Sequence, residues 1–301
     1  MEFIRPSEIT DAMLTSDVPE NDYPEWVSGQ VYTQGTRVIR TQTHRIYSLI
    51  GTNGTTPPED DELNWLDEAP TNRWAMFDRQ INTATEQVES ITVSLVPGRI
   101  NALALLELQA YQVIVTLEAN GETVFSATYS LVDINANVGD WYGYLTEPIE
   151  QVDYLYIDQL IDSALLNIPA YGNGVLTITL NNPGGVVRVG MLKVGMLYPI
   201  GDTTAEPDLG ITDYSLRKID AFGNRVLTKR AAAKDLRCDV RIDTVRLDSV
   251  FSMLYRYKDE DLVWIPAKQH GSMIIYGLAT WRIKRQNSID SILTMTLEGS
   301  I

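Results

Sequence analysis

The stretch VVRVGMLKVGML, residues 186–197, is predicted to be a β-strand and anchors the assignment of a mainly β fold. It repeats Val-Gly-Met-Leu five residues apart, and Met in a strand usually fills a hydrophobic core, so we expect Met191 and Met196 to pack inside. Glycine within a strand weakens pairing unless it marks a β-bulge or the close approach of a neighbouring backbone. We expect bulges at Gly190 and Gly195.

The region around this stretch, residues 70–201, alternates apolar and polar side chains in the manner of strands with one buried face. The pattern predicts an antiparallel β-sandwich, jelly-roll-like, over residues 70–201. Turn signals separate the runs at Asn120-Gly121, Asn173-Gly174 and Pro183-Gly184-Gly185. The alternating apolar positions are Ile91, Val93 and Leu95; Tyr111, Val113, Val115 and Leu117; and Val152, Tyr154 and Tyr156.

Downstream, the segment DTTAEPDLG, residues 202–210, is rich in acid, Thr and Pro and is predicted to be a linker. Residues 211–301 are predicted to form a C-terminal α+β docking domain, in which one helix lies across a sheet. The helix is indicated by apolar residues that share one face at helical spacing: Leu247, Val250, Phe251 and Leu254. Strands are expected at residues 262–265, 273–278 and 292–297, the last with Leu293, Met295 and Leu297 on its buried face.

Upstream, residues 1–22 are predicted to form an N-terminal helical arm. The segment SEITDAMLTS, residues 7–16, offers Ser7 as an N-cap and three apolar residues that could share one face. Pro19 and Pro24 would then end the helix.

Residues 23–69 are dense in Gly, Pro, Thr and aromatic residues and are predicted to form a small β module of two or three short strands. Its acidic run at residues 59–62 is predicted to be a solvated turn that keeps the module soluble. A calcium loop needs acids at alternate positions, whereas these four are consecutive. A glycosidase pair would need two carboxylates across a cleft, which the spacing alone does not indicate.

The composition is that of an ordinary globular protein, with 301 residues of which 44% are hydrophobic and 21% charged. No apolar run approaches the roughly 18 residues that span a bilayer. The start, MEFIRPSEIT, also lacks the apolar segment of a secretory signal. We therefore expect a soluble protein without a membrane partner. The single Cys238 excludes an internal disulfide and a thiolate metal cluster within one chain.

The net charge of −16 is unevenly distributed along the chain. Residues 1–205 carry 9 basic and 27 acidic side chains, whereas residues 206–301 carry 15 basic and 13 acidic ones. An acidic majority repels phosphate backbones, so nucleic-acid binding is disfavoured. The asymmetry could steer like subunits into register, or it could reflect only the separate solubility of each part.

The sequence carries no nucleophile-elbow, zinc-protease, P-loop or dinucleotide-binding motif, so we expect no catalytic residue, no cofactor and no metal site. His44 and His270 are expected to be surface or hydrogen-bonded structural residues rather than bases. The densest aromatic region is expected to pack on strand faces, with a sugar or partner surface as the alternative. That region contains Trp141, Tyr142, Tyr144, Tyr154 and Tyr156.

The small module also carries an ordered set of residues in the pattern W, YxxGxxV, Y, G, P, W: Trp26, Tyr32, Gly35, Val38, Tyr47, Gly54, Pro57 and Trp65. The pattern resembles the small chitin-binding-like β-modules of chitinases and many bacteriophage tail proteins. The resemblance implies that the outer Trp residues and the YxxGxxV turn build a minimal core. Sugar binding in that family uses exposed aromatic residues just after the second Tyr, where this chain has Leu49-Ile50-Gly51-Thr52. A carbohydrate site would therefore have to use Trp26, Tyr32, Tyr47 or Trp65.

Two further stretches resemble tail proteins of tailed bacteriophages. PTNRWAMFD, residues 70–78, is similar to the phrase that follows this module in such proteins. DYSLRKIDAFGNRVLTKR, then a helix, then VWIPAKQHGSMIIYGLATWRI and a final LEGSI are similar to C-terminal domains of tail-tip and baseplate-associated proteins. In those domains a YG turn and a last strand close the unit, matched here by Tyr276-Gly277 and Leu297-Glu298-Gly299.

These resemblances imply a non-catalytic structural component of a tailed-phage virion, at the tail tip or baseplate, that is assembled in the host cytoplasm. The expected partners are other tail proteins, copies of the chain itself in a ring, and a host surface glycan. Two alternatives stay open. One is an adhesin that binds cell-surface glycans through the sandwich, and the other is an enzyme that acts on polysaccharide with two carboxylates of the sandwich.

Overall fold

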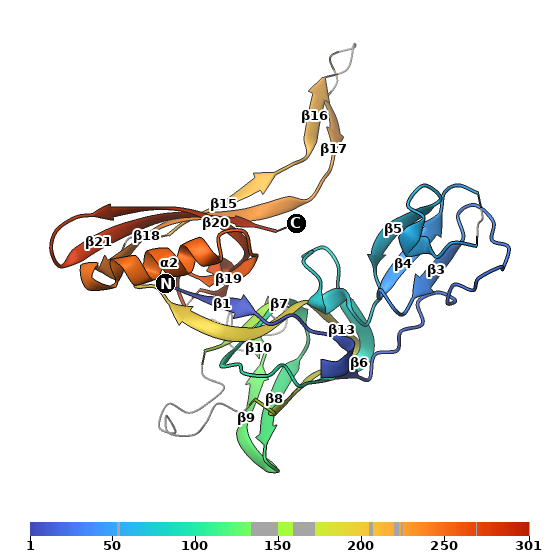
Figure 1. The fold of residues 1–301 in the computed structure, drawn as a ribbon, viewed down its shortest axis with the longest axis horizontal. Coiled ribbons are helices and arrows are strands. Elements are labelled where there is room, and N and C mark those ends of the chain that lie inside the picture. The colour runs from blue at the N-terminus through green and yellow to red at the C-terminus, as the bar shows by residue number, and fades with distance from the viewer. Residues whose placement is uncertain are drawn as a thin grey trace, which may run out of the picture.

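The structure is a computed structural model that describes residues 1–52, 55–133, 150–158, 172–204, 207–219, 223, 225–268 and 270–300. Within these residues the fold is mainly β, the strands pair antiparallel, and the α-helix is a single short one, α2 (Leu247–Arg256). The predicted mainly β class is therefore confirmed. Figure 1 shows a central body from which the small module and a long hairpin project.

Fourteen strands of the described residues belong to one large sheet, and three small sheets are separate from it. The large sheet contains β1 (Glu2–Pro6), β2 (Leu14–Ser16), β6 (Thr85–Leu95), β7 (Ala102–Gln109), β8 (Gln112–Ala119), β9 (Glu122–Ser130), β12 (Tyr154–Ile157), β13 (Val175–Pro199), β14 (Asp202–Thr203), β15 (Asp208–Asp213), β18 (Ala232–Asp243), β19 (Leu262–Ile265), β20 (Ile275–Arg285) and β21 (Asp290–Gly299). The small sheets are β3 (Arg37–Arg40) with β4 (Arg45–Leu49) and β5 (Trp65–Pro70), β10 (Val132–Asp133) with β11 (Glu150–Gln151), and β16 (Leu216–Ile219) with β17 (Arg225–Thr228). Single 3-10 turns lie at Asp11–Met13, Pro58–Asp60, Ala75–Phe77, Thr244–Arg246 and Gly271–Met273.

Strand β13, with 25 residues, is the central strand of the body. Strands β6 and β8 both pair with its first part, from Leu176 to Asn181. Strands β7 and β1 pair with its second part and meet at Gly195, which lies opposite both Ala102 and Pro6. Its Met191 is fully buried, as expected, because neighbouring strands enclose this part of β13, whereas Met196 is only partly buried.

The bulges expected at Gly190 and Gly195 are not found. Between β13 and β7 the register is continuous, and the irregularity of β13 lies further back, between Asn181 and Val186. The glycines instead allow close approach of a neighbouring chain. A Cβ atom placed on Gly195 would lie 1.9 Å from the carbonyl oxygen of Arg5, and one on Gly190 would lie 2.5 Å from the Cβ of Glu107.

The predicted N-terminal helical arm is wrong: residues 7–16 contain a 3-10 turn at Asp11–Met13 and strand β2, and the residues before them form strand β1. Strand β1 lies between β13 and β19, where Phe3 is opposite both Tyr198 and Trp264. Phe3 and Ile4 are both fully buried and belong to two different hydrophobic cores, one on each face of the sheet. A helix with one apolar stripe could not bury two consecutive side chains on opposite faces, so strand pairing is favoured.

The predicted linker at residues 202–210 is also wrong over its described part. Strand β14 pairs with β18, and β15 pairs with the same strand nearer its start. Polar residues are compatible with both positions, because a strand at the edge of a sheet has one side in solvent.

The predicted helix and strands of the C-terminal part are largely confirmed. Val250 and Leu254 of α2 are buried in one core with Leu293, Met295 and Leu297 of β21. Strand β19 has the predicted bounds, whereas Met273 lies in a 3-10 turn that precedes β20. Phe251 was expected on the buried face, but it is 47% exposed, and its ring meets that of Trp281 edge to face at 5.2 Å.

We predict that Gly195→Ala destabilises the protein by about 1–3 kcal/mol, because the added methyl group meets the backbone of β1 rather than a flexible side chain. Urea unfolding, followed as the shift of the midpoint, measures the loss. Gly172→Ala is the matched control, since no atom of the described residues lies within 4 Å of its added Cβ. Equal midpoints for the two variants would contradict the close approach of β1.

Candidate functional site

The four aromatic residues expected for carbohydrate binding form the core of the small module. Trp26, Tyr32, Tyr47 and Trp65 are 8%, 9%, 5% and 2% exposed, and they cluster with Val38 and Leu49. The rings of Tyr32 and Trp65 meet edge to face at 5.6 Å. Sequence reasoning therefore grouped these four residues correctly, but the structure leaves none of their faces open for stacking on a sugar.

Polar contacts close this core at its rim. The Tyr32 hydroxyl accepts a hydrogen bond from the Val27 amide at 2.7 Å. The guanidinium of Arg40 lies 5.2 Å from the ring centre of Trp26 and forms an ion pair with Glu59 at 2.6 Å. The hydrogen bonds from Arg40 lower the pKa of the Glu59 carboxyl.

The acidic run contributes to the same turn. Asn64 donates hydrogen bonds of 2.9 Å to both carboxylate oxygens of Asp61. Asp60 and Glu62 instead are exposed. Two members of the run therefore stabilise the turn, and the other two face solvent, as expected for part of a solvated turn.

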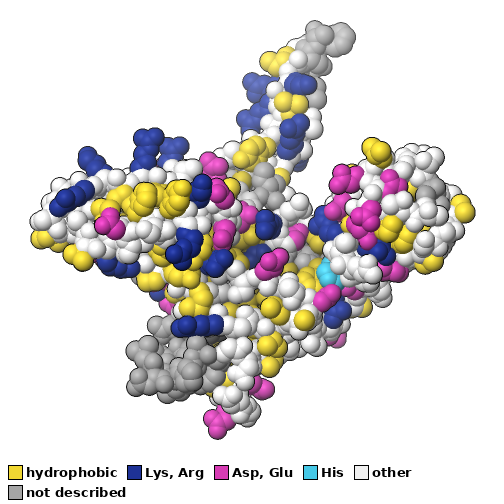
Figure 2. Space-filling view, in the orientation of Figure 1, with side chains coloured by type: hydrophobic (Ala, Val, Ile, Leu, Met, Phe, Trp, Pro, Cys, Tyr) yellow, Lys and Arg dark blue, Asp and Glu magenta, His cyan; other side chains and the backbone are white. Residues whose placement is uncertain are grey.

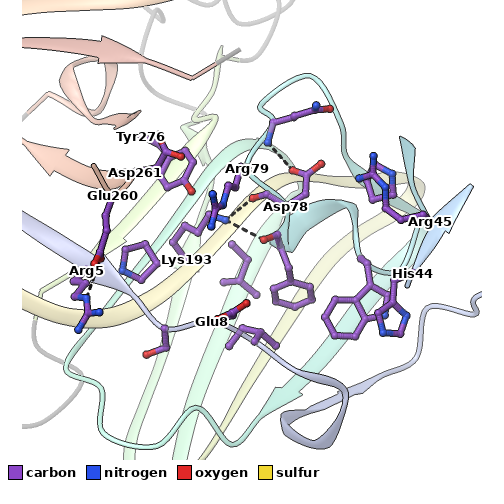
Figure 3. A pocket seen from close by; sticks show the side chains of 18 of the residues that line it. Arg5, Glu8, His44, Arg45, Asp78, Arg79, Lys193, Glu260, Asp261 and Tyr276 are labelled. Carbon is purple, nitrogen blue, oxygen red and sulfur yellow. Dashed lines mark hydrogen bonds and ion pairs between the residues drawn. The ribbon is translucent and has the colours of Figure 1, made fainter. Parts of the chain in front are cut away.

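A cavity of about 760 Å³ lies where the small module, the central body and the C-terminal part meet (Figure 3). Arg5 at the end of β1 and Glu8 just after it line the cavity, and the small module contributes His44 and Arg45. Lys193 enters from β13, and Asp78 and Tyr276 lie beside it. The cavity therefore brings together segments that are far apart in the sequence.

Lys193 is the most unusual residue of this cavity, because it is only 6% exposed. Its Nζ donates hydrogen bonds to the carbonyl oxygens of Phe77 and Asp78, and it lies 4.8 Å from the ring centre of Tyr276. Burial lowers the pKa of Lys193 from 10.5 to about 8. Near neutral pH, which is below this pKa, the ammonium has three N–H donors, and two of them meet these carbonyl acceptors.

The neighbouring ionisable groups are also held by local contacts. The Asp78 carboxylate accepts hydrogen bonds from the Gln80 amide at 2.8 Å and from the Thr83 hydroxyl at 2.7 Å. Burial raises the pKa of Asp78, and burial also raises the pKa of Tyr276 to about 12. Arg5 forms an ion pair with Glu260 at 3.1 Å. Hydrogen bonds and ion pairs between these groups are typical of a junction that fixes the positions of three segments.

His44 attaches the small module to the rest of the chain. Its ring nitrogens lie 3.0 Å from Glu20 and 3.1 Å from Asp11, and its ring stacks on Trp74 at 4.0 Å. The expected hydrogen-bonded structural role is therefore found. Lys193 was not identified from the sequence. Its place within the apolar run of residues 186–197 could have indicated a buried lysine, because lysine is rarely buried without a partner.

The aromatic-rich region is described only in part. Trp141, Tyr142 and Tyr144 lie outside the described residues. Tyr154 and Tyr156 are partly buried and pack against one of the cores of the large sheet, as expected for strand-face packing. The Tyr156 hydroxyl donates a hydrogen bond to Glu2 at 3.4 Å, which joins β12 to the N-terminal strand.

The hairpin β16–β17 exposes apolar and basic side chains together. It extends away from the body in Figure 1, and Figure 2 shows Lys and Arg side chains in dark blue along it. Ile219 is 73% exposed and Leu227 is 53% exposed. We call residues 214–231 the basic arm, because they hold five basic and one acidic side chain.

Comparisons with family models, with curated proteins and with solved structures found no match to this chain. Over the described residues, no cluster of three or more His, Cys, Asp or Glu side chains is placed to hold a metal ion. None of the described helices is both long and apolar enough to cross a membrane.

We predict that Trp65→Ala destabilises the small module by about 3–5 kcal/mol, because Trp65 is one of the largest fully buried side chains. Hydrogen exchange over residues 23–69 measures the effect within the module. Leu63→Ala is the control, since Leu63 is 89% exposed and its loss should change stability by less than about 0.5 kcal/mol. Unchanged exchange in Trp65→Ala would show that Trp65 is not a core residue.

We also predict that the free energy of unfolding of the wild type rises with pH relative to that of Lys193→Met. The pKa of Lys193 is about 8 in the folded chain, against an ordinary value of 10.5, so the unfolded chain binds more protons between these values. The contribution of Lys193 to the free energy of unfolding therefore rises across this window, by on the order of 1–3 kcal/mol. Urea unfolding of both proteins at several pH values measures it. Parallel pH profiles would contradict a lowered pKa.

Proposed function

We propose that the protein is a structural component of a tailed-phage virion, in the tail-tip or baseplate region, and that it assembles through protein–protein contacts. The observation that carries the assembly role is the basic arm, a two-stranded hairpin that exposes Ile219 and Leu227 away from the body. Exposed apolar side chains on a projecting element favour a partner surface over a free one. The assignment to a phage tail rests on the sequence resemblances of the small module and the C-terminal part.

In this proposal the chain has three functional parts. Residues 70–201 form a jelly-roll-like sandwich, residues 211–301 form an α+β docking domain, and the small module faces outward, where it can meet the host surface. Copies of the chain assemble in a ring, because repeated contacts between unlike surfaces generate closed rings when the rotation closes. Burial of Trp26, Tyr32, Tyr47 and Trp65 argues against glycan binding by the small module. The adhesin alternative, which binds glycans through the sandwich, does not depend on these four residues.

Two measurements on the full chain test this function. Light scattering of the purified protein should give a concentration-dependent oligomer, because exposed docking surfaces associate by mass action. Electron microscopy of virions labelled with an antibody to the protein should place the label at the tail tip. A protein that stays monomeric up to its solubility limit, or a label on the capsid or off the particle, would refute the proposal.

A further inference from the structure

We propose that the basic arm binds the turn at residues 60–66 in the small module of a second copy of this chain. The inference rests on the proposed assembly function and specifies which two surfaces meet. A two-stranded hairpin without further packing is marginally stable in water, yet β16 and β17 pair only with each other within the described residues. The arm therefore needs a surface that covers it.

The strand register of the basic arm places two arginines and two apolar side chains on one face of the hairpin. Arg217 lies opposite Leu227, and Ile219 lies opposite Arg225, so these four side chains share one face of the hairpin. All four are exposed. Arg217 forms an ion pair with Asp213 at 3.0 Å, and its side chain is still 77% exposed. The face thus presents two apolar side chains between two arginines.

The turn of the small module presents the opposite combination. Leu63 is 89% exposed and Leu66 is 50% exposed, which is unusual for leucine in a module with so small a core. Asp60 and Glu62 are exposed beside them, and within the part of the chain that the structure describes neither has an ion-pair partner. This surface therefore presents two apolar side chains and two carboxylates without an ion-pair partner. We call it the acidic turn.

Charge complementarity selects the second copy as the partner. The small module, residues 23–69, holds seven acidic and three basic side chains, and the basic arm holds five basic and one acidic. Figure 2 shows the two surfaces on separate projections, with Asp and Glu side chains in magenta gathered on the module. Opposite charges on two surfaces of one chain promote association between copies and fix their orientation.

The contact is intermolecular in this proposal. Among the described residues no hydrogen bond or ion pair joins the arm to the module of the same chain. A contact between two unlike surfaces of identical chains is heterologous, so each copy would use its arm on one neighbour and its acidic turn on the other. Such a contact leads to a ring when the rotation closes.

Charge reversal on each surface tests the contact in the full-length protein. Arg217→Glu with Arg225→Glu reverses the arm, and Asp60→Lys with Glu62→Lys reverses the acidic turn. Each double variant alone should associate about 100-fold more weakly than the wild type, as measured by sedimentation velocity over a concentration series, because like charges then face each other. An equimolar mixture of the two variants should regain association, since every arm then finds a turn of opposite charge.

Arg282→Glu with Lys284→Glu is the matched control, because it makes the same charge change at exposed positions of β20 and should leave association unchanged. If the wild type associates, and both reversed variants associate equally well, the contact between arm and turn is refuted while the assembly function stands. If the variants fail and their mixture also fails, the pairing of these two surfaces is refuted. A wild type that stays monomeric refutes the proposed function itself.

Discussion

Strand β1 holds the body of this protein together, because it supplies the hydrogen bonds that join β13 to β19. Its two consecutive side chains Phe3 and Ile4 enter different cores, so the first residues of the chain stabilise both faces of the large sheet. The close approach of β1 to β13 is possible because Gly195 has no side chain. Loss of this strand would leave backbone groups of both neighbours unpaired in a buried setting, which is costly.

The polar junction follows from that arrangement. Once β1 fixes the two parts of the body, Lys193 on β13 reaches the carbonyl groups of Phe77 and Asp78, and His44 connects the small module to Glu20 and Asp11. Burying a lysine is tolerated where its donors are satisfied and its charge can be lost. The residues that line the cavity therefore form a junction between segments that are far apart in the sequence.

The surfaces of the molecule differ in a way that suits assembly. Aromatic side chains of the small module are used inside it, whereas leucines and carboxylates are presented outside. The arm presents arginines with Ile219 and Leu227, and it has little packing of its own. Projections with complementary charges and uncovered apolar side chains are suited to the contact between copies that is proposed above.

Local pattern was sufficient for the mainly β class, the strand at residues 292–297, helix α2 and the aromatic core of the small module. Each of these depends on side-chain periodicity or on the need of a small unit for large apolar residues. The partners of each strand depended on contacts between residues far apart in the sequence. For that reason the short segment after Ser7 was mistaken for a helix, and the polar residues 202–210 for a linker. Lys193, Phe77 and His44 could be recognised as a junction only when folding brought their segments together, because hydrogen bonding and burial act through space and leave no regular spacing along the chain.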